Sequence, residues 1–160
     1  QYGCQESGRG YQSEDAGAVA MKVYLAGKYS RKQEFLAYAA ELTSLGHDVV
    51  SSWLWTSLDD SQAKAVEVAT YSILQEVGEK FAVRDFMDLA GAGVLISFTE
   101  PVRAEGKDRG GRHVELGMAL AWGTDIIIVV GPRENVFYCH PDVEVVSTWE
   151  DAKKMLSQYN

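Results

Sequence analysis

The sequence predicts an α/β protein whose strands form one parallel sheet. Short, nearly continuous apolar segments alternate along the chain with segments of helical periodicity. Strands that are apolar throughout need cover on both faces, which helices on either side of a parallel sheet provide. The length of 160 residues, with 46% hydrophobic and 24% charged residues, fits one domain with a core of its own.

Five segments have the character of buried strands. Each is short and almost wholly apolar. The first ends at Gly27, and the second runs into Trp53 and Trp55. The expected strands are Lys22–Ala26, Asp48–Ser52, Gly93–Phe98, Asp125–Val130 and Val143–Val146.

Helical patterns fill the intervals between these strands. We expect Gly46 to end the first helix and Thr148, with Asp151 three residues on, to cap the last. The other expected helices are Arg31–Leu45, Ser61 to about Leu89 with Gly78 as a point of interruption, and Arg112–Trp122. The chain is therefore assigned to the flavodoxin-like class, a three-layer sandwich with a five-stranded parallel sheet.

Composition limits the location and the organisation of the chain. Residues 1–20 lack periodicity and are expected to form a flexible leader or an added segment, ahead of one domain over 21–160. No apolar run approaches the ~20 residues that cross a bilayer, and no signal-peptide pattern is present. We therefore expect a cytoplasmic protein without a membrane partner.

Charge and metal-ligand spacing exclude two further classes. The net charge is −8 without a Lys/Arg cluster, which disfavours a nucleic acid polymer as partner but not a single phosphate on a small ligand. Cys4 and Cys139 are expected to be free thiols. His113 and His140 have no ligand spacing with other His or Cys residues, so no metal site is expected.

A glycine-rich segment before the third predicted helix carries the strongest candidate for catalysis. Gly110–Gly117 (GGRHVELG) joins the polar loop 99–111 to that helix. We expect Glu115 in the first turn, where free N–H groups and the helix dipole favour a carboxylate. An ionised carboxylate at the ligand edge of the sheet is suited to attack an anomeric carbon. The alternative is a first-turn glutamate that only stabilises the helix. Gly117 would let the helix backbone lie close to the sheet or the substrate.

The turn after the first strand has the pattern of an anion site. In Val23–Arg31 (VYLAGKYSR), Gly27 permits a tight turn and Ser30 is expected to cap the next helix. The segment matches neither the P-loop nor the dinucleotide fingerprint. Tyr24 is either a core residue or a donor to a carboxylate across the pocket.

Two acidic residues precede the third strand. Asp85 and Asp88 are three apart and share a helix face. Their carboxylates could bind ribose hydroxyls or a base edge, or they could simply form a solvated helix end. Ligands in such sheets bind at the carboxyl ends of the strands, where the strand order reverses.

In this order, the three motifs resemble those of the nucleoside 2-deoxyribosyltransferase family and its nucleotide N-hydrolase relatives. The resemblance extends from about Met21 to the C-terminus. It rests on Tyr24, Gly27, Asp85, Gly111 and Glu115-Leu116-Gly117.

The resemblance implies a retaining enzyme that cleaves the N-glycosidic bond of a nucleoside or nucleotide. Glu115 would attack C1′ and form a glycosyl-enzyme intermediate, Tyr24 would orient Glu115, and Asp85 would contact the base and help to protonate it. A second base as acceptor makes the enzyme a transferase; water makes it a monophosphate N-hydrolase. A third interpretation is a non-catalytic nucleotide-binding domain or an NAD-cleaving signalling domain. The family needs no metal or organic cofactor.

Further residues are expected to hold the substrate. They are Gly27, Tyr29, Ser30, Arg31, Trp53, Asp88, Gly111 and Arg112. Transferases of the family often have an Asp six residues before the nucleophile, where this chain has Arg109 beside Asp108. Arg109 and Arg112, with Ser30 and Arg31, suit a 5′-phosphate.

The tryptophans have alternative roles. Trp53 or Trp55 could stack on a base, although core packing or a subunit contact fits each as well. The family resemblance implies a homo-oligomer, with Trp122 and the helix 61–90 as interface elements.

Overall fold

The computed structural model describes residues 19–56, 71–100 and 110–159. Its centre is a five-stranded sheet in the order β2-β1-β3-β4-β5, and every neighbouring pair is parallel. The strands are β1 (Lys22–Ala26), β2 (Asp48–Val49), β3 (Val94–Phe98), β4 (Ile126–Val130) and β5 (Val143–Val146). The α/β prediction is thereby confirmed, and the strand order reverses between β1 and β3.

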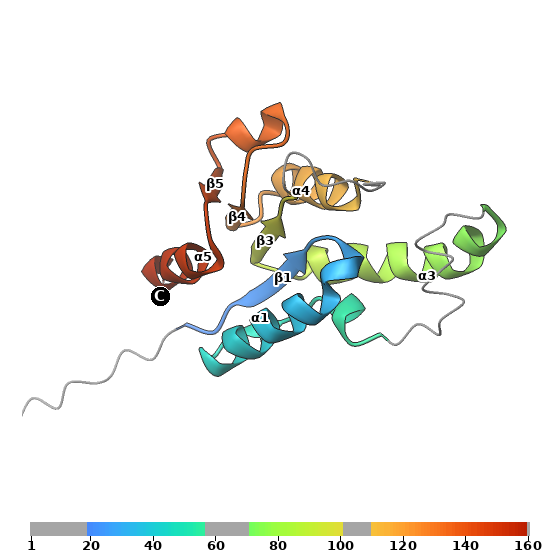
Figure 1. Cartoon of the computed structure of the whole chain (residues 1–160), viewed down its shortest axis with the longest axis horizontal. Helices are drawn as coiled ribbons and strands as arrows, with labels where there is room; N and C mark the ends of the chain where they lie inside the picture. Colours follow the sequence, from blue (N-terminus) through green and yellow to red (C-terminus); the bar gives the residue numbers. More distant parts are fainter. Residues whose placement is uncertain (1–18, 57–70, 101–109, 160) are drawn as a thin grey trace, which may run out of the picture.

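Helices cover both faces of this sheet (Figure 1). The helices are α1 (Lys32–Ser44), α3 (Tyr71–Ala90), α4 (Gly111–Trp122) and α5 (Trp149–Leu156). On one face α1 meets α5, where the Tyr38 ring stacks on Trp149 at 4.4 Å. On the other face α3 meets α4, where Phe86 packs edge-on against Trp122 at 4.9 Å. The molecule is thus a three-layer sandwich.

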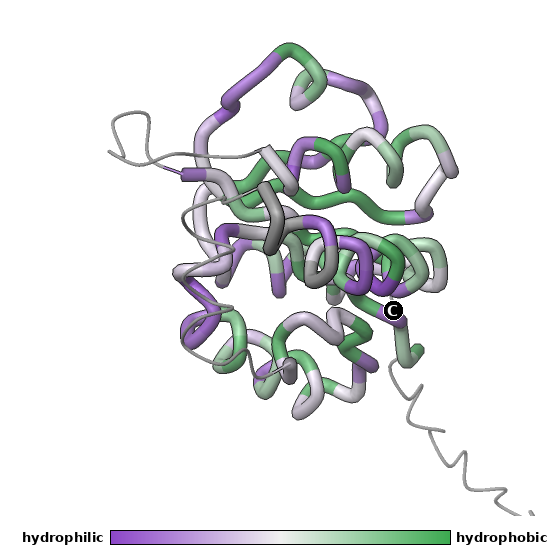
Figure 2. Tube along the Cα trace, turned by 90° about the vertical axis from the view of Figure 1, so that its right-hand side faces the viewer, coloured by the Kyte–Doolittle hydropathy of each residue, from purple (hydrophilic) through white to green (hydrophobic). Residues whose placement is uncertain are grey.

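The core lies between these layers. Figure 2 shows hydrophobic residues along the central strands and hydrophilic residues on the helices and connections around them. All five residues of β3 and all five of β4 are buried. Such uninterrupted burial explains why these strands have no alternation of polar and apolar residues.

The second strand is shorter than predicted. A 3-10 turn over Ser52–Leu54 replaces its expected last residue. The Ser51 hydroxyl accepts a hydrogen bond from the Leu25 N–H at 2.5 Å. Because a side chain fulfils the role of a ladder carbonyl here, β2 ends while its neighbour continues.

The helix ends confirm two predictions and correct a third. Gly46 has φ +89° after α1, and the Thr148 hydroxyl accepts from the Asp151 N–H at 3.1 Å at the start of α5. Ser30 does not cap a helix, because it lies inside a 3-10 turn, Tyr29–Arg31, that leads directly into α1. The long helix passes Gly78 without a break; residues 61–70 of the prediction fall outside the described ranges.

Candidate functional site

A tyrosine and a glutamate meet where the strand order reverses. Tyr24, in the middle of β1, is fully buried. Its side chain lies on the side of the sheet that α3 and α4 cover, where its hydroxyl donates to Glu115 Oε1 on α4 at 2.7 Å. The hydrogen bond expected between these residues is therefore present, and it connects positions 91 residues apart in the sequence.

The position of Glu115 on its helix differs from the prediction. The helix α4 begins at Gly111, because Gly110 adopts a left-handed φ of 71° and the next residue is already helical. Glu115 is thus the fifth helical residue, and the first turn has no acidic residue. Its carboxylate therefore lies beyond the free N–H groups of the helix start and depends on Tyr24 instead.

Burial changes the protonation of this pair. Burial raises the pKa of Glu115 to about 7; the hydrogen bond from Tyr24 opposes that rise, and the Asp85 charge adds to it. Burial, followed by the Glu115 charge, raises the pKa of Tyr24 far above its ordinary value. The phenol therefore remains a donor, while protonated and ionised Glu115 coexist near neutral pH.

Asp85 provides the second acid of the site. It lies half-buried on α3, and its negative charge is among the causes of the pKa shifts of Glu115 and Tyr24. Burial raises the pKa of Asp85 to about 6, against the lowering effect of Arg84. Within the described ranges, its buried Oδ1 has no hydrogen-bond partner. An acid whose pKa lies near 6 is still partly protonated slightly below neutral pH, and with an unused oxygen it can protonate or bind a ligand.

Asp88 and Trp53 have contacts within the protein. Asp88 Oδ2 accepts from the Ser52 N–H at 2.9 Å and from the Ser52 hydroxyl, which fastens the 3-10 turn to α3. Trp53 is 7% exposed, packs edge-on against Phe35, and donates from Nε1 to the Leu25 carbonyl at 3.0 Å. Trp53 is therefore a core residue and not a platform for a base, whereas Trp55 is 57% exposed.

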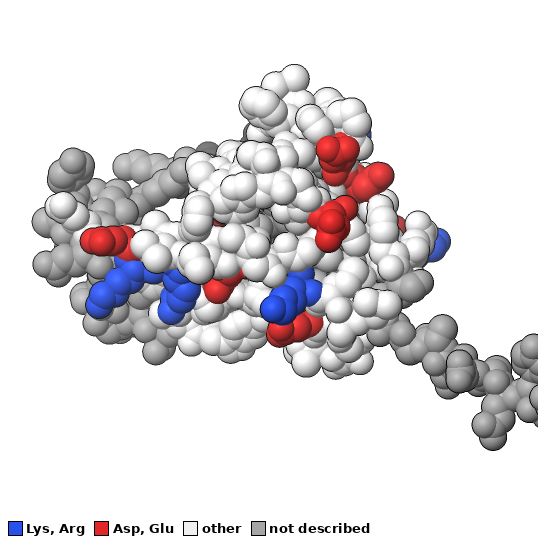
Figure 3. Space-filling view, turned by 180° about the vertical axis from the view of Figure 1, so that it is seen from behind, with Lys and Arg blue, Asp and Glu red and all other residues white. Residues whose placement is uncertain are grey.

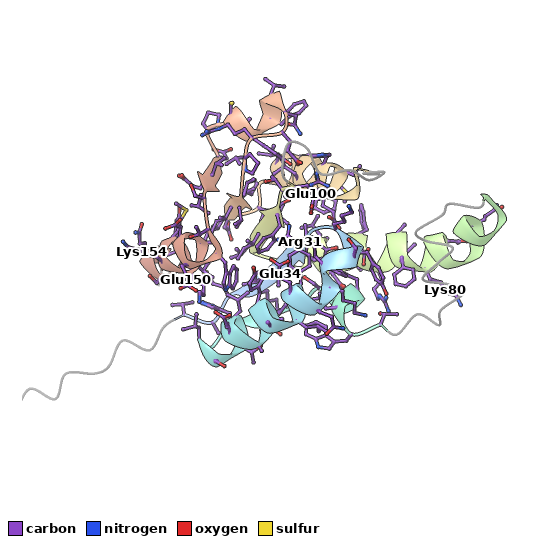
Figure 4. The ribbon with its side chains drawn as sticks, viewed as in Figure 1. Arg31, Glu34, Lys80, Glu100, Glu150 and Lys154 are labelled. Carbon is purple, nitrogen blue, oxygen red and sulfur yellow. The ribbon has the colours of Figure 1, made fainter. Side chains whose placement is uncertain are left out.

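The cation expected at the first turn is surrounded by acceptors. Figure 4 shows Arg31 near Glu34 and Glu100. The Arg31 guanidinium makes two 2.7 Å hydrogen bonds to Glu34 and 3.2 Å bonds to Glu100 and to the Thr99 carbonyl. With its charge matched in this way, Arg31 is poorly placed to bind a phosphate as the sequence suggested. Ser30 is exposed beside it.

The other described arginine of the expected phosphate site is buried. Arg112 is 4% exposed and binds the Glu134 carboxylate at 2.7 and 2.8 Å through Nη2 and at 3.2 Å through Nε. Its charge is therefore paired with Glu134 inside the fold. Arg109 and Asp108 fall outside the described residues.

The glycines and Tyr29 have simple surroundings. A Cβ on Gly27 would lie 2.3 Å from Phe35 Cζ, so this glycine allows close packing of the Phe35 ring. Gly111 and Gly117 are exposed, and a Cβ on either would meet no described atom within 4 Å. Tyr29 is half-buried near Trp53, with ring centroids 6.3 Å apart.

Sequence reasoning missed Glu134 and Tyr138. Tyr138 is fully buried; its hydroxyl donates to Glu134 at 3.2 Å and lies 3.0 Å from His113 Nδ1. The one available signal was Arg112 itself, since a buried guanidinium needs a carboxylate partner. The identity of that partner follows only from the tertiary structure.

Metal-ligand clusters and membrane-spanning helices are both absent from the described residues. In the three described ranges, no group of three His, Cys, Asp or Glu residues could hold a metal ion. Cys139 is exposed and free, and Cys4 falls outside those ranges. No helix in the described part of the chain has both the length and the apolar character needed to cross a membrane.

Comparison with known proteins gives a distant structural likeness. No protein-family model matches the sequence, and a search of curated proteins finds no match. Among solved structures, the chain is similar to the CMP N-glycosidase BcmB of Clostridium botulinum, with 17% identity and a TM-score of 0.48. The alignment covers 86% of this chain and 97% of that chain.

Proposed function

We propose that this chain cleaves the N-glycosidic bond of a nucleoside or nucleotide, with Glu115 as nucleophile, and transfers the sugar to a second base. The observation that carries the proposal is the hydrogen bond from Tyr24 to Glu115 Oε1, with Asp85 close enough to affect the pKa of both. This arrangement supplies an oriented carboxylate, a fixed donor and an acid at the ligand edge of the sheet.

Each group has one task in the proposed reaction. The ionised Glu115 carboxylate attacks C1′, the bond from C1′ to the base breaks, and its electron pair passes to the base. Asp85 gives its proton to the departing base. A nitrogen of a second base then attacks C1′, the bond from C1′ to the Glu115 oxygen breaks, and Glu115 becomes a free carboxylate again. The incoming base gives a proton to Asp85. Two displacements at C1′ retain the configuration.

The charges around the site favour a nucleoside over a nucleoside monophosphate. Arg31 and Arg112, the two described arginines expected at a phosphate, are both paired with carboxylates. An added phosphate would have to compete with Glu34, Glu100 and Glu134 for them. We therefore place the monophosphate N-hydrolase second to the transferase.

One set of assays tests the proposal. The full chain is incubated with deoxynucleosides or their 5′-monophosphates, with and without a second free base. Exchange of the base supports the transferase, and free base from a monophosphate without acceptor supports the hydrolase. Nucleotide binding without any cleavage would contradict the proposal and favour a binding domain.

The nucleophile is tested by substitution. Glu115→Ala should reduce turnover by at least about 10³-fold while the protein stays folded, because the covalent step loses its nucleophile. Glu150→Gln is a matched control, since the Glu150 side chain is 78% exposed on α5. Activity that survives in the Glu115 variant would refute the assignment.

The second part of the proposal concerns self-association. Helices α3 and α4 lie side by side and expose a row of large apolar side chains, with Phe86 against Trp122. The exposed members are Val83, Phe86, Met87, Val114 and Trp122, each 43–63% exposed. We propose that this face, here called the α3–α4 face, binds the same face of a second copy. Its exposed apolar side chains let two chains of net charge −8 meet without placing like charges opposite one another.

A further inference from the structure

A buried ion pair joins the helix that carries Glu115 to the connection between β4 and β5. The buried face of α4 consists of Arg112, Leu116 and Ala119. Two of these are apolar residues that pack against the sheet. Arg112, by contrast, is charged, although its side chain is only 3% exposed. Its carboxylate partner is Glu134 on the β4–β5 connection. A guanidinium at such a depth needs a partner in a fixed place.

The same carboxylate also holds the end of the third strand. Besides its bonds to Arg112, Glu134 accepts from the Glu100 N–H at 3.2 Å, and Glu100 comes two residues after β3. The Tyr138 hydroxyl donates to Glu134 from the 3-10 turn Val136–Cys139. Glu134 is therefore a common acceptor for the end of β3, for α4 and for the 3-10 turn, whose Tyr138 follows four residues after it in the chain.

The neighbouring residue on α4 repeats this link. His113 Nδ1 lies 3.0 Å from the Tyr138 hydroxyl and 3.3 Å from Asn135 Nδ2. The first turn of α4 is thus fastened by two consecutive side chains to the β4–β5 connection. Glu115 lies two residues beyond this fastened turn, so any shift of the turn also shifts the carboxylate.

We propose that Glu134 is a positioning residue, which holds Arg112 so that α4 presents the Glu115 carboxylate to the Tyr24 hydroxyl. Within the described residues, Glu134 makes no hydrogen bond or ion pair to Tyr24, Asp85 or Glu115; its effect passes through the helix. The proposal deepens the proposed function, since it names a residue that the same site requires.

The sharpest variant is Glu134→Asp, which keeps the negative charge and shortens the side chain by one methylene. To maintain the ion pair, the start of α4 must move or the geometry of the pair must loosen. A misplacement of about 1 Å in a reacting group costs up to ~10²-fold in rate. We therefore expect kcat to fall roughly 10- to 100-fold, while KM stays within about threefold of the parent value.

A second readout does not depend on activity. The carboxyl carbon of Glu115 can be followed by NMR during a pH titration of the full chain, with Glu115→Gln to assign its signal. The groups that affect Glu115 are Tyr24 on β1 and Asp85 on α3. Loss of the Tyr24 hydrogen bond raises the pKa of Glu115 in Glu134→Asp, and since the variant keeps its charge, the change reflects geometry.

Two further variants complete the test. Tyr138→Phe removes one donor to Glu134 and should shift kcat and the Glu115 titration in the same direction by less. Glu41→Gln is the control, because it loosens an ion pair with Lys153 on the opposite face of the sheet and should change neither quantity. A Glu134→Asp protein with the Glu115 titration and kcat of the parent would overturn the inference. If the parent cleaves no substrate, the proposed function fails, and the titration still decides the positioning role.

Discussion

Glu115 combines two properties that usually exclude one another. Its burial raises its pKa to about 7, yet its proposed task requires the ionised form. The Tyr24 hydroxyl resolves part of this conflict, because a donor at 2.7 Å stabilises the carboxylate in place of water. At the scale of the residue, the site consists of the Glu115 carboxylate and the Tyr24 phenol, whose hydrogen bond favours the ionised form of Glu115.

The pH dependence of the reaction follows from this pair of acids. The proposed active form has Glu115 ionised and Asp85 protonated, although their pKa values are about 7 and about 6. We expect kcat/KM to be bell-shaped, with limbs at these two apparent values and a maximum midway, near pH 6.5. In Asp85→Asn, the alkaline limb should disappear, so that kcat/KM rises with pH to a plateau. A profile of the parent that stays flat from pH 5 to 8 would contradict both roles.

The stability of the fold should also depend on Glu115. Its pKa is raised from 4.5 in the exposed state to about 7 in the folded state. Between these values the folded chain holds a proton that the unfolded chain has released, so the free energy of unfolding falls as pH rises through this window.

Glu115→Gln should abolish this decrease in the free energy of unfolding with rising pH. We expect the variant to be more stable than the parent at pH 8, by roughly 1–3 kcal/mol, and nearly equal to it below pH 4.5. Urea unfolding at several pH values measures the difference. A difference that does not change with pH would show that Glu115 is not buried in its ionised form.

At the scale of the element, β1 and α4 place the two partners. The register of β1 against β3 pairs Tyr24 with Leu95, so both side chains face the α3–α4 layer, while Leu25 and Ile96 face the opposite layer. Helix α4 approaches the sheet with Leu116 and Ala119 and thereby brings Glu115 within reach of Tyr24 on β1. A one-residue slip of β1 would turn Tyr24 away from Glu115.

Two glycines at the edges of these elements should respond in opposite directions. Gly27→Ala places a Cβ within 2.3 Å of the Phe35 ring and should destabilise the fold by about 1–3 kcal/mol. Gly117→Ala adds a methyl group to an exposed helical position with no described atom within 4 Å, and should stabilise it by about 0.5–1 kcal/mol. Thermal unfolding of both variants measures these effects. A destabilised Gly117→Ala protein would indicate that this surface is covered by something else.

At the scale of the whole molecule, charge and apolar surface are separated. Seen from behind (Figure 3), the charged side chains form small groups with uncharged surface between them. The chain carries 23 acidic and 15 basic residues, and their excess of negative charge keeps chains apart wherever charged surfaces meet. Contact between copies is therefore favoured at an uncharged surface, such as the α3–α4 face.

The assembly is tested by a charge on this face. Trp122→Glu places a carboxylate beside Phe86 and should convert the parent oligomer to monomer in sedimentation velocity. Phe137→Glu is the matched control, since Phe137 is 64% exposed on the β4–β5 connection and is not among the residues of the α3–α4 face. A parent chain that sediments as a monomer at all concentrations, or an oligomer unaffected by Trp122→Glu, would refute the proposed interface.

The sequence by itself determined the layered architecture. Apolar segments such as β5 were placed with their correct bounds, because burial on both faces leaves a local pattern. The same local reasoning put Tyr24, Asp85 and Glu115 near one edge of the sheet, since the residues at the ends of parallel strands converge there. The Thr148 cap was also predictable from local sequence, because the N–H that it accepts from belongs to Asp151, three residues away.

Only the tertiary structure decided what surrounds these residues. Arg112 and Arg31 have the composition of a phosphate site, but Arg112 is paired with a carboxylate 22 residues away, and Arg31, besides Glu34 three residues on, with one 69 residues away. The raised pKa of Glu115 is likewise a property of depth, which no local pattern records. Periodicity reports which face of an element is buried, whereas the partner of a buried charge depends on which distant segments the fold brings together.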